Sequence, residues 1–273
     1  MTDPHPAVPA GPDPETPRRR RRQPFLAVLR KEILRFVLQL ETVPVVVFVT
    51  AALALWAYDY YGSISFFTRV IAERFQIPFA IADPASYFYW YGCAFVMLML
   101  IPQLVLRATT RLKKDDSIPT LGWGLGDWRL GVPAVAIFYG VMLPILCVVV
   151  WTSDFQGKYP LYEDADRSVA MFVGYEAAYA LYFIAWEYFF RGFMTFSLEK
   201  TLGIWTVFVQ MLPFVVMHFG KPDLEAMSAV FGGIALGYLA LRTRSFWYGV
   251  FIHAATAVTL DVLVVSVKHF HLR

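Results

Sequence analysis

Long apolar blocks separated by short polar stretches make up most of the chain from residue 42 onward. A helix needs on the order of 20 mostly apolar residues to cross about 30 Å of hydrocarbon. Seven blocks approach this length, at residues 42–58, 86–106, 131–152, 170–193, 203–219, 227–241 and 246–267. The pattern therefore predicts an all-α fold, a polytopic membrane helix bundle with about seven transmembrane helices.

The beginning of the chain follows two other patterns. Residues 1–24 are rich in proline and contain no apolar run, so they are expected to form a disordered tail. Over residues 25–41, apolar side chains recur every three or four positions, and charged side chains occupy the other face. The apolar positions are Phe25, Leu29, Ile33, Phe36 and Leu40. This second segment is therefore predicted to be an amphipathic helix that lies in the membrane interface.

The transmembrane region divides into two parts, with no internal repeat and no second soluble domain. Residues 42–169 contain the N-terminal spans and their loops, and residues 170–267 form a second transmembrane core. Residues 268–273 form a short polar tail. The polar residues of most interest all lie in the second core, so we expect the function to reside there.

The distribution of charge predicts an orientation. Arg18 to Arg22 form an uninterrupted basic run. Beside a membrane domain, such a run is expected to bind anionic lipid rather than nucleic acid, and to hold the N-terminus in the cytoplasm. Residues 107–130 carry five basic and three acidic side chains, whereas residues 153–168 carry two basic and four acidic ones. Because basic loops stay inside, the first loop is expected in the cytoplasm and the second outside.

Composition excludes several other classes of protein. Of the 273 residues, 58% are hydrophobic and only 16% are charged. A soluble globular domain usually carries about 25% charged residues. Two cysteines cannot staple a chain of this length, and both Cys93 and Cys147 lie inside apolar blocks. A soluble enzyme, a disulfide scaffold and a cysteine nucleophile are therefore all disfavoured.

Ionisable side chains inside transmembrane spans are costly, so each is a functional hypothesis. Glu187 and Arg191 are four residues apart, which places them on one helical face. They form either a structural ion pair or a general base whose basicity is tuned by a guanidinium.

Two histidines extend this hypothesis to other spans. His218 precedes a Gly-Lys-Pro sequence, where a helix breaks and the backbone can open towards a cavity. His253 lies about two turns into the last apolar block, and Asp261 follows it by eight residues on the same face. Glu225 can pair with Lys221 as an ordinary surface contact. Together with Glu187 and Arg191, the two histidines predict one buried polar site.

The order and spacing of these residues resemble the CAAX-protease and bacteriocin-processing family, also called CPBP or ABI, of intramembrane endopeptidases. The family pattern is E-E-x-x-x-R, then F-x-x-x-H, then H-x-x-x-N or H-x-x-x-D, on successive transmembrane helices. Residues 187–192, residues 214–218 and His253 match this order within about the last third of the chain. The run W-E-Y-F-F-R-G at residues 186–192 is similar to a single-glutamate bacterial subgroup that reads W-E-x-F-F-R-G.

The sequence departs from the family pattern at two positions. Trp186 stands where the family has the first glutamate, to which water activation is usually credited, so only Glu187 is kept. Ala257 stands where the third motif ends in asparagine or aspartate, and Asp261, one turn further on, could replace that residue.

The resemblance implies an intramembrane protease, a CAAX-protease-like glutamic endopeptidase, whose catalytic core spans residues 170–267. Its substrate would be a membrane-anchored protein or peptide cut near the anchor, towards the C-terminus. We expect Glu187 to activate the water, His218 to position it or donate a proton, and Arg191 with His253 to stabilise the oxyanion. Asp261 and Glu225 are possible auxiliary residues. A bacterial inner membrane is the expected location.

Two alternatives remain open. No cofactor is expected, but a zinc-dependent protease would use Glu187, His218 and His253 as ligands, since two histidines and a glutamate form a standard catalytic zinc set. Alternatively, the chain could be a non-catalytic membrane binding or immunity protein on the same scaffold, because Trp186 and Ala257 depart from the family pattern.

Overall fold

The computed structural model describes residues 25–112 and 120–271, and within these ranges every regular element is helical. The predicted tail at residues 1–24, which includes the run Arg18 to Arg22 that is expected to bind lipid, and the last two residues lie outside the described residues. The chain divides into two units, Met1–Leu40 and Glu41–Arg273.

The described part of the first unit is one helix, α1 (Phe25–Gln39). It forms where the amphipathic period predicted a helix. Glu32 accepts an ion-paired hydrogen bond from Arg35 at 2.9 Å on its polar face, while apolar side chains such as Phe25 and Ile33 are exposed. The exposed apolar face is consistent with contact to lipid, and the interfacial position remains a prediction.

The second unit contains all the remaining elements. In chain order these are α2 (Thr42–Tyr61), α3 (Ile64–Phe66), η1 (Phe67–Ala72), α4 (Phe79–Ala94), η2 (Phe95–Leu100), α5 (Ile101–Leu112), α6 (Trp128–Val149), α7 (Ser153–Lys158), η3 (Glu163–Arg167), α8 (Val169–Glu187), η4 (Tyr188–Thr195), α9 (Phe196–Leu202), η5 (Gly203–Trp205), α10 (Thr206–Val216), α11 (Asp223–Thr243) and α12 (Trp247–His271). The elements α4, η2 and α5 follow one another directly, as do α8, η4 and α9.

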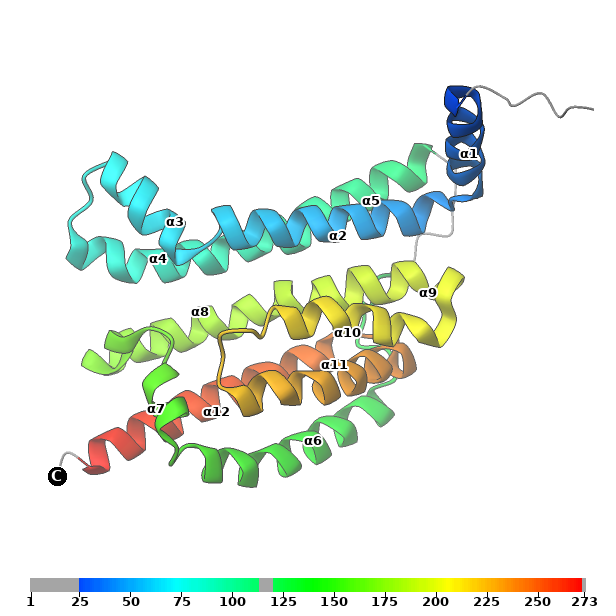
Figure 1. The fold of residues 1–273 in the computed structure, drawn as a ribbon. Helices are drawn as coiled ribbons and strands as arrows, with labels where there is room; N and C mark the ends of the chain where they lie inside the picture. Colours follow the sequence, from blue (N-terminus) through cyan, green and yellow to red (C-terminus); the bar gives the residue numbers. More distant parts are fainter. Residues whose placement is uncertain (1–24, 113–119, 272–273) are drawn as a thin grey trace, which may run out of the picture. The chain divides into compact units, whose positions relative to one another are not determined.

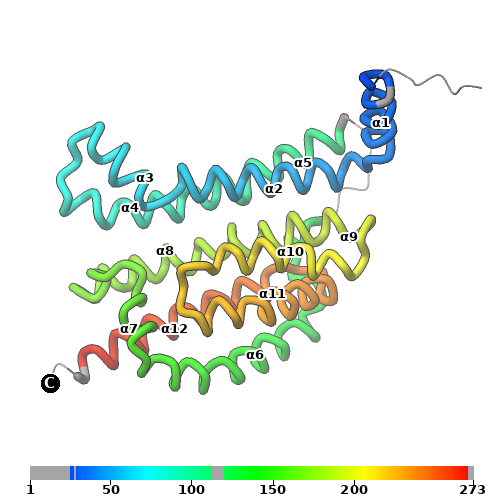
Figure 2. Tube along the Cα trace, in the orientation of Figure 1, coloured from blue at the N-terminus to red at the C-terminus, as the bar shows by residue number. Residues whose placement is uncertain are grey.

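The helices of the second unit lie roughly along one common direction (Figures 1 and 2). The continuous helical stretch of α8, η4 and α9 is packed on one side by the helices α2, α4 and α5 and by η2, which joins α4 to α5. On the other side pack α10, α11 and α12, and α6 contacts α12 from outside. The helix α8 therefore runs through the middle of the unit, with α12 antiparallel beside it (Figure 1).

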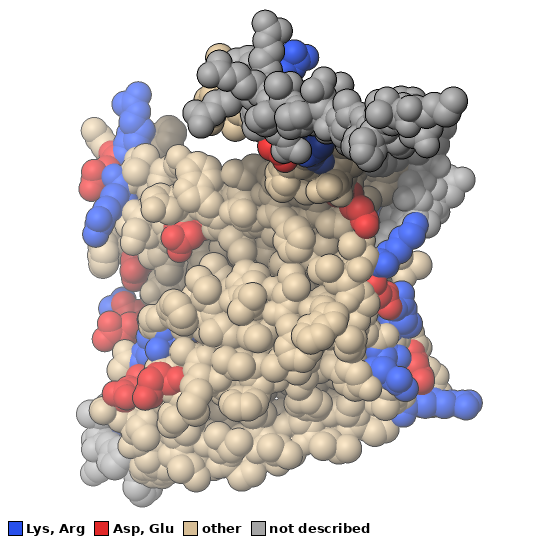
Figure 3. All heavy atoms as spheres, turned by 45° about the vertical axis from the view of Figure 1, so that its right-hand side comes forward, with Lys and Arg blue, Asp and Glu red and all other residues tan. Residues whose placement is uncertain are grey.

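The length and composition of the helices confirm a polytopic membrane bundle. Among the described residues, six helical segments are long and apolar enough to cross a membrane: Thr42–Tyr61, Phe79–Arg111, Trp128–Val149, Val169–Val216, Asp223–Thr243 and Trp247–His269. The sequence predicted about seven, because the fourth segment contains two of the predicted spans. On the face shown in Figure 3, charged side chains gather mainly along two opposite sides, and the area between them is predominantly uncharged.

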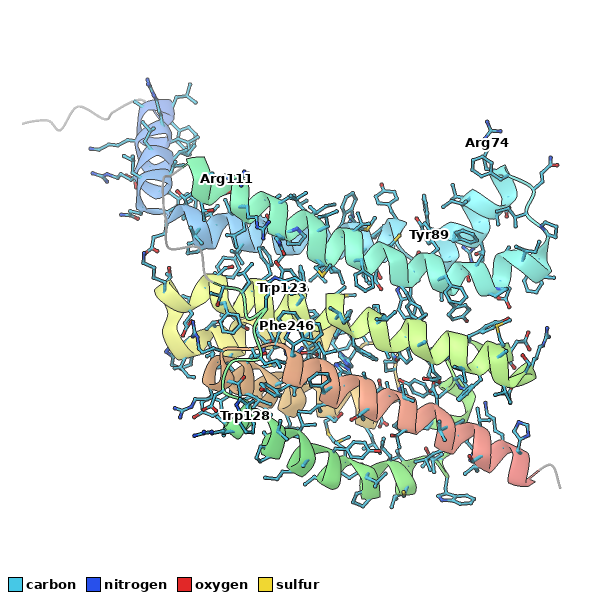
Figure 4. The ribbon with its side chains drawn as sticks, turned by 180° about the vertical axis from the view of Figure 1, so that it is seen from behind. Arg74, Tyr89, Arg111, Trp123, Trp128 and Phe246 are labelled. Carbon is cyan, nitrogen blue, oxygen red and sulfur yellow. The ribbon has the colours of Figure 1, made fainter. Side chains whose placement is uncertain are left out.

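An aromatic cluster fills one end of the bundle. Trp123, in the loop before α6, has its ring centre 5.2 Å from that of Phe246 and 5.2 Å from that of Tyr188. Its carbonyl accepts a hydrogen bond from the indole Nε1 of Trp247 at 2.9 Å. Figure 4 shows Trp123 and Phe246 close together at the end of the bundle where α6 begins at Trp128. The buried residues of η4 therefore pack against this loop.

Candidate active site

A short helix brings the predicted site residues to one level. The helix α10 has only 11 residues and ends at Val216, so His218 lies in the turn that leads into α11. Glu187 is the last residue of α8, but the chain continues as a helix through η4 and α9. Glu187 therefore lies in the interior of a long helical stretch, beside the break that carries His218. A span of full length would have carried His218 past Glu187.

Glu187 is fully buried and has two partners on the same oxygen. Its Oε1 accepts a hydrogen bond from Arg191 Nη1 at 3.1 Å and one from His253 Nδ1 at 2.8 Å. Its Oε2 has no hydrogen-bond partner among the described residues and faces the backbone of Gly249 on α12. One carboxylate therefore joins α8 and α12 and still has a lone acceptor oxygen.

Arg191 supports this carboxylate from the adjacent π-helical turn, η4. Its side chain is fully buried, and its guanidinium carbon lies 4.0 Å from the centre of the Phe214 ring on α10. A cation over an aromatic face is attracted by the ring quadrupole, and this stabilises the charge in a poorly hydrated site. Removing one partner of a buried ion pair costs about 3–5 kcal/mol, so Arg191 stabilises Glu187 in this position.

His218 is positioned by the helix that precedes it. Its Nδ1 lies 2.7 Å from the carbonyl oxygen of Phe214, one turn earlier. Because a carbonyl only accepts, Nδ1 carries the hydrogen, and Nε2 of the neutral ring is an acceptor. Burial lowers the pKa of His218 to about 3, and the neighbouring His253 adds to the shift. His218 is therefore neutral at physiological pH.

The two imidazole rings face each other across a gap. Their centres are 6.3 Å apart and their planes differ by 14°. The ring of Phe183 is also stacked on His253, with the ring centres 4.3 Å apart. Since Nδ1 of His253 is engaged by Glu187, its Nε2 is the nitrogen that remains free. The structure therefore brings together all four residues predicted to be catalytic: Glu187, Arg191, His218 and His253.

Two cavities meet at the histidine pair. A polar cavity of about 660 Å³ is lined by both histidines, by Trp186 and by the charged side chains of Lys158, Glu163, Lys221, Glu225 and Lys268. An apolar groove of about 550 Å³ between α6, α11 and α12 is also lined by His218 and His253. Glu187 and Arg191 line neither cavity. Any reactant in the cavities therefore meets the histidines first, with Glu187 behind His253.

Glu225 lies on the wall of the polar cavity, where Tyr159 and Lys221 hold it in place. Its carboxylate accepts a hydrogen bond from the hydroxyl of Tyr159, at 2.6 Å for Oε2 and 2.7 Å for Oε1, and the same hydroxyl accepts one from Lys221 Nζ at 2.7 Å. Lys221 and Glu225 also form the expected ion pair, at 3.7 Å. Burial lowers the pKa of the Lys221 amine and raises that of the Tyr159 hydroxyl. Tyr159 was not foreseen, because it comes from a loop about 60 residues away.

Asp261 lies apart from Glu187 and His253. It is fully buried on α12 and contacts Glu176, a residue of α8 that no sequence motif singled out. Its suggested role as a replacement for the missing third-motif residue therefore stays a prediction. Glu176 could have been found from the sequence, since it is an ionisable side chain inside an apolar block.

The positions that depart from the family pattern are filled by apolar packing. Trp186 is buried, lines the polar cavity and has its ring centre 6.1 Å from that of His218. Its indole Nε1 has no hydrogen-bond partner among the described residues. Ala257 lines the apolar groove. Neither position supplies a second carboxylate at the site.

The donor set does not fit a zinc ion in this arrangement. Within the described residues, no three histidine, cysteine, aspartate or glutamate side chains are grouped so that they could hold a metal ion. Arg191 and His253 both bond Glu187 Oε1, so Nδ1 of His253 is directed to the carboxylate and not to a shared metal position. The reaction proposed below therefore has no step that passes through zinc.

The stability of the protein is expected to fall on the acidic side of neutrality because of His218. An ordinary histidine has a pKa of about 6.5, so the unfolded chain takes up a proton below this pH while folded His218 resists it until about pH 3. Replacing His218 with glutamine, which can still bond Phe214, should flatten the fall in Tm between about pH 7 and about pH 5. The Tm of the full chain in detergent measures this. The exposed His269→Gln variant is the control, and an unchanged slope in His218→Gln would contradict the assignment.

Comparison with known families identifies the segment that holds the site. Searches of the curated proteins and of the solved structures found no match for the chain. Residues 169–259 match the family model described as Type II CAAX prenyl endopeptidase Rce1-like. The matched segment runs from the start of α8 into α12 and contains Glu187, Arg191, His218 and His253. This match supports the CAAX protease family, and with it an integral membrane protease that acts on a membrane-associated protein.

Proposed function

We propose that this protein is an intramembrane endopeptidase that cleaves a peptide bond close to the membrane anchor of its substrate, near the C-terminus. The observation that carries the proposal is the pair formed by buried Glu187 and partly exposed His253, at the point where a polar cavity and an apolar groove meet. A carboxylate that orients a histidine towards a cavity is the arrangement needed to activate water.

The two cavities suit the two parts of a membrane-anchored substrate. The apolar groove is lined mainly by aliphatic and aromatic side chains, including Phe138 and Leu236, and can receive the anchor. The polar cavity, with Lys158, Lys221 and Lys268 on its wall, can receive the hydrophilic segment that is released. A substrate that fills both cavities would present the bond between them to His218 and His253.

In the proposed reaction, Glu187 activates water through His253. A water molecule in the polar cavity gives its proton to Nε2 of His253 as its oxygen attacks the scissile carbonyl. The charge of Glu187 stabilises the imidazolium that forms, through the hydrogen bond to Nδ1. The same imidazolium then protonates the leaving amine. In this role Glu187 does not touch the water, because the imidazole of His253 stands between them, whereas in direct general-base catalysis Glu187 would take the proton itself.

His218 and Arg191 take supporting roles in this scheme. With its Nδ1 hydrogen on Phe214, His218 can accept a hydrogen bond from the attacking water and hold it against the carbonyl. It cannot donate from Nε2 in this tautomer. Arg191 pairs with Glu187 and holds its carboxylate in place. Of the two functions that the sequence suggested for His218, positioning is therefore the one we propose.

The proposal also includes an orientation. The basic loop at residues 107–130 and the run Arg18 to Arg22, which we expect to contact anionic lipid, place the N-terminus in the cytoplasm of a bacterial cell, with the protein in the inner membrane. The polar cavity is lined by residues of the loop that contains α7, for which the charge pattern predicts the opposite side. In this orientation the released peptide leaves on the outer side.

One observation favours the non-catalytic alternative. Glu187 and Arg191 line neither cavity, and Trp186 occupies the place of a second glutamate. A binding protein on the same scaffold would keep such a buried pair for stability alone. The two functions differ in whether any peptide bond is cut.

The proposed function can be tested by comparing protein C-termini in membrane fractions. Cells that carry the wild type, the His218→Ala variant or no copy of the protein would be analysed by mass spectrometry at matched expression levels. We expect one class of membrane-anchored proteins to keep a longer C-terminus in both the variant and the deletion. If no terminus differs although the deletion has a phenotype, the non-catalytic function is the correct one.

A further inference from the structure

A second pair of acidic side chains joins α8 and α12, away from the site described above. Glu176 on α8 is only 7% exposed, and Asp261 on α12 is fully buried. The two carboxyl groups contact each other, and the Tyr175 side chain lies near Asp261. As carboxylates, all four oxygens lack a donor among the described residues.

Two carboxylates cannot both be ionised in this position at an acceptable cost. Both residues lie in segments that cross the membrane by length and composition. Like charges in contact repel strongly in a low dielectric, and each buried charge loses its hydration. A hydrogen bond between two carboxyl groups also needs one proton, because a carboxylate only accepts. The contact is therefore a pair that shares a proton.

The surrounding groups do not remove this requirement. Tyr179 faces the pair from α8 itself, and Tyr91, Tyr159, Lys221 and Glu225 face it from other elements. The tyrosines are neutral. Lys221 is the one cation in this set, and it is already paired with Glu225. One lysine against three carboxyl groups leaves an excess of negative charge that bound protons must neutralise.

The position of the pair links it to the candidate active site. Glu176 precedes Glu187 by 11 residues, which is three helical turns, and Asp261 follows His253 by eight residues. Because α8 and α12 run antiparallel, the contacts Glu187–His253 and Glu176–Asp261 are two polar links at two levels of the same helix pair. Losing one link would allow α12 to shift along α8, and the other contact would change its geometry.

We infer that Glu176 and Asp261 form a proton-sharing carboxyl pair that fixes the register of α12 against α8, and thereby positions His253 on Glu187. Both are positioning residues, since neither lies at the reacting atoms. Loss of the shared proton at high pH would separate the helices at this level. The inference concerns the helix pair itself and holds whether or not the protein is a protease.

The test is the pH dependence of Tm for the full chain purified in detergent. The wild type should lose Tm on the order of 5 °C between about pH 6 and about pH 9, as the shared proton is lost. In Glu176→Gln the side-chain amide can donate a hydrogen bond to Asp261 at any pH and needs no bound proton to do so. The Tm of this variant should therefore stay nearly constant over this range. Glu176→Ala, which leaves Asp261 alone, should be less stable than Glu176→Gln at every pH. Glu73→Gln, a change of an exposed glutamate, should behave like the wild type.

Two results would overturn the inference. One is a Glu176→Gln variant whose Tm falls with pH as steeply as that of the wild type, since no shared proton would then be lost. The other is a Glu176→Ala variant as stable as Glu176→Gln. A separate measurement of proteolysis, once a substrate is known, should show the alkaline limb of the pH profile moving in Glu176→Gln. If Glu187→Gln proves fully active or the protein proves not to be a protease, the Tm result still stands alone.

Discussion

Replacing Glu187 with glutamine is expected to reduce peptide hydrolysis by about 10³- to 10⁴-fold while the protein remains folded. The amide oxygen can still accept hydrogen bonds from Arg191 and His253, so the local geometry is kept. What is lost is the negative charge that stabilises protonated His253. The measurement is the single-turnover rate of the purified full chain on a substrate found by comparing C-termini, with Tm recorded alongside.

A matched control separates this effect from general damage. Glu199 lies on the same helical stretch as Glu187 and pairs with Arg244 at 2.7 Å on the surface. Since exposed ion pairs contribute little, Glu199→Gln should hydrolyse substrate at nearly the wild-type rate. The double variant Glu187→Gln/His253→Ala should be no slower than the slower single variant, because the two residues act as one unit. Additive losses would mean that Glu187 activates water independently of His253.

The main features of the fold followed from the apolar pattern. Ionisable residues inside apolar blocks are rare enough that Glu187, Arg191, His218 and His253 stood out, and the structure brings all four together. The number of spans was harder to predict. The predicted fourth span and most of the fifth fall in one candidate segment, Val169–Val216, because α8, η4, α9, η5 and α10 follow one another directly.

Other parts of the site depend on contacts that no local pattern shows. Tyr159 meets Glu225 and Lys221 only because the loop around α7 folds over the start of α11. The position of Glu187 behind His253, rather than on a cavity wall, follows from the way α12 packs on α8. Glu176 did carry a sequence signal, but it matched no motif. Its meaning depended on Asp261, which is 85 residues away in the chain.

The close packing of α12 on α8 leads to a prediction at a residue with no chemistry of its own. Gly249 is one helical turn before His253, and its Cα faces the free oxygen of Glu187. A Cβ at this position would overlap Glu187 Oε2 and would lie 3.1 Å from the carboxyl carbon. Gly249→Ala is therefore expected to displace the carboxylate from His253. A misplacement of about 1 Å at a reacting group can cost about 100-fold in rate, so we expect a loss of that size in turnover.

The same substitution at an open position provides the control. A methyl group on Gly140 of α6 would meet no atom within 4 Å, so Gly140→Ala adds the same group without a collision. Alanine also favours a helix over glycine by about 1 kcal/mol, and Gly140→Ala should therefore keep full turnover and lose no Tm. Gly249→Ala should slow turnover far more than its Tm changes, because the overlap falls on one carboxylate and only slightly on the packing around it. Wild-type turnover in Gly249→Ala would show that the contact between Glu187 and His253 is not needed for hydrolysis, and the proposed route of the proton would then be wrong.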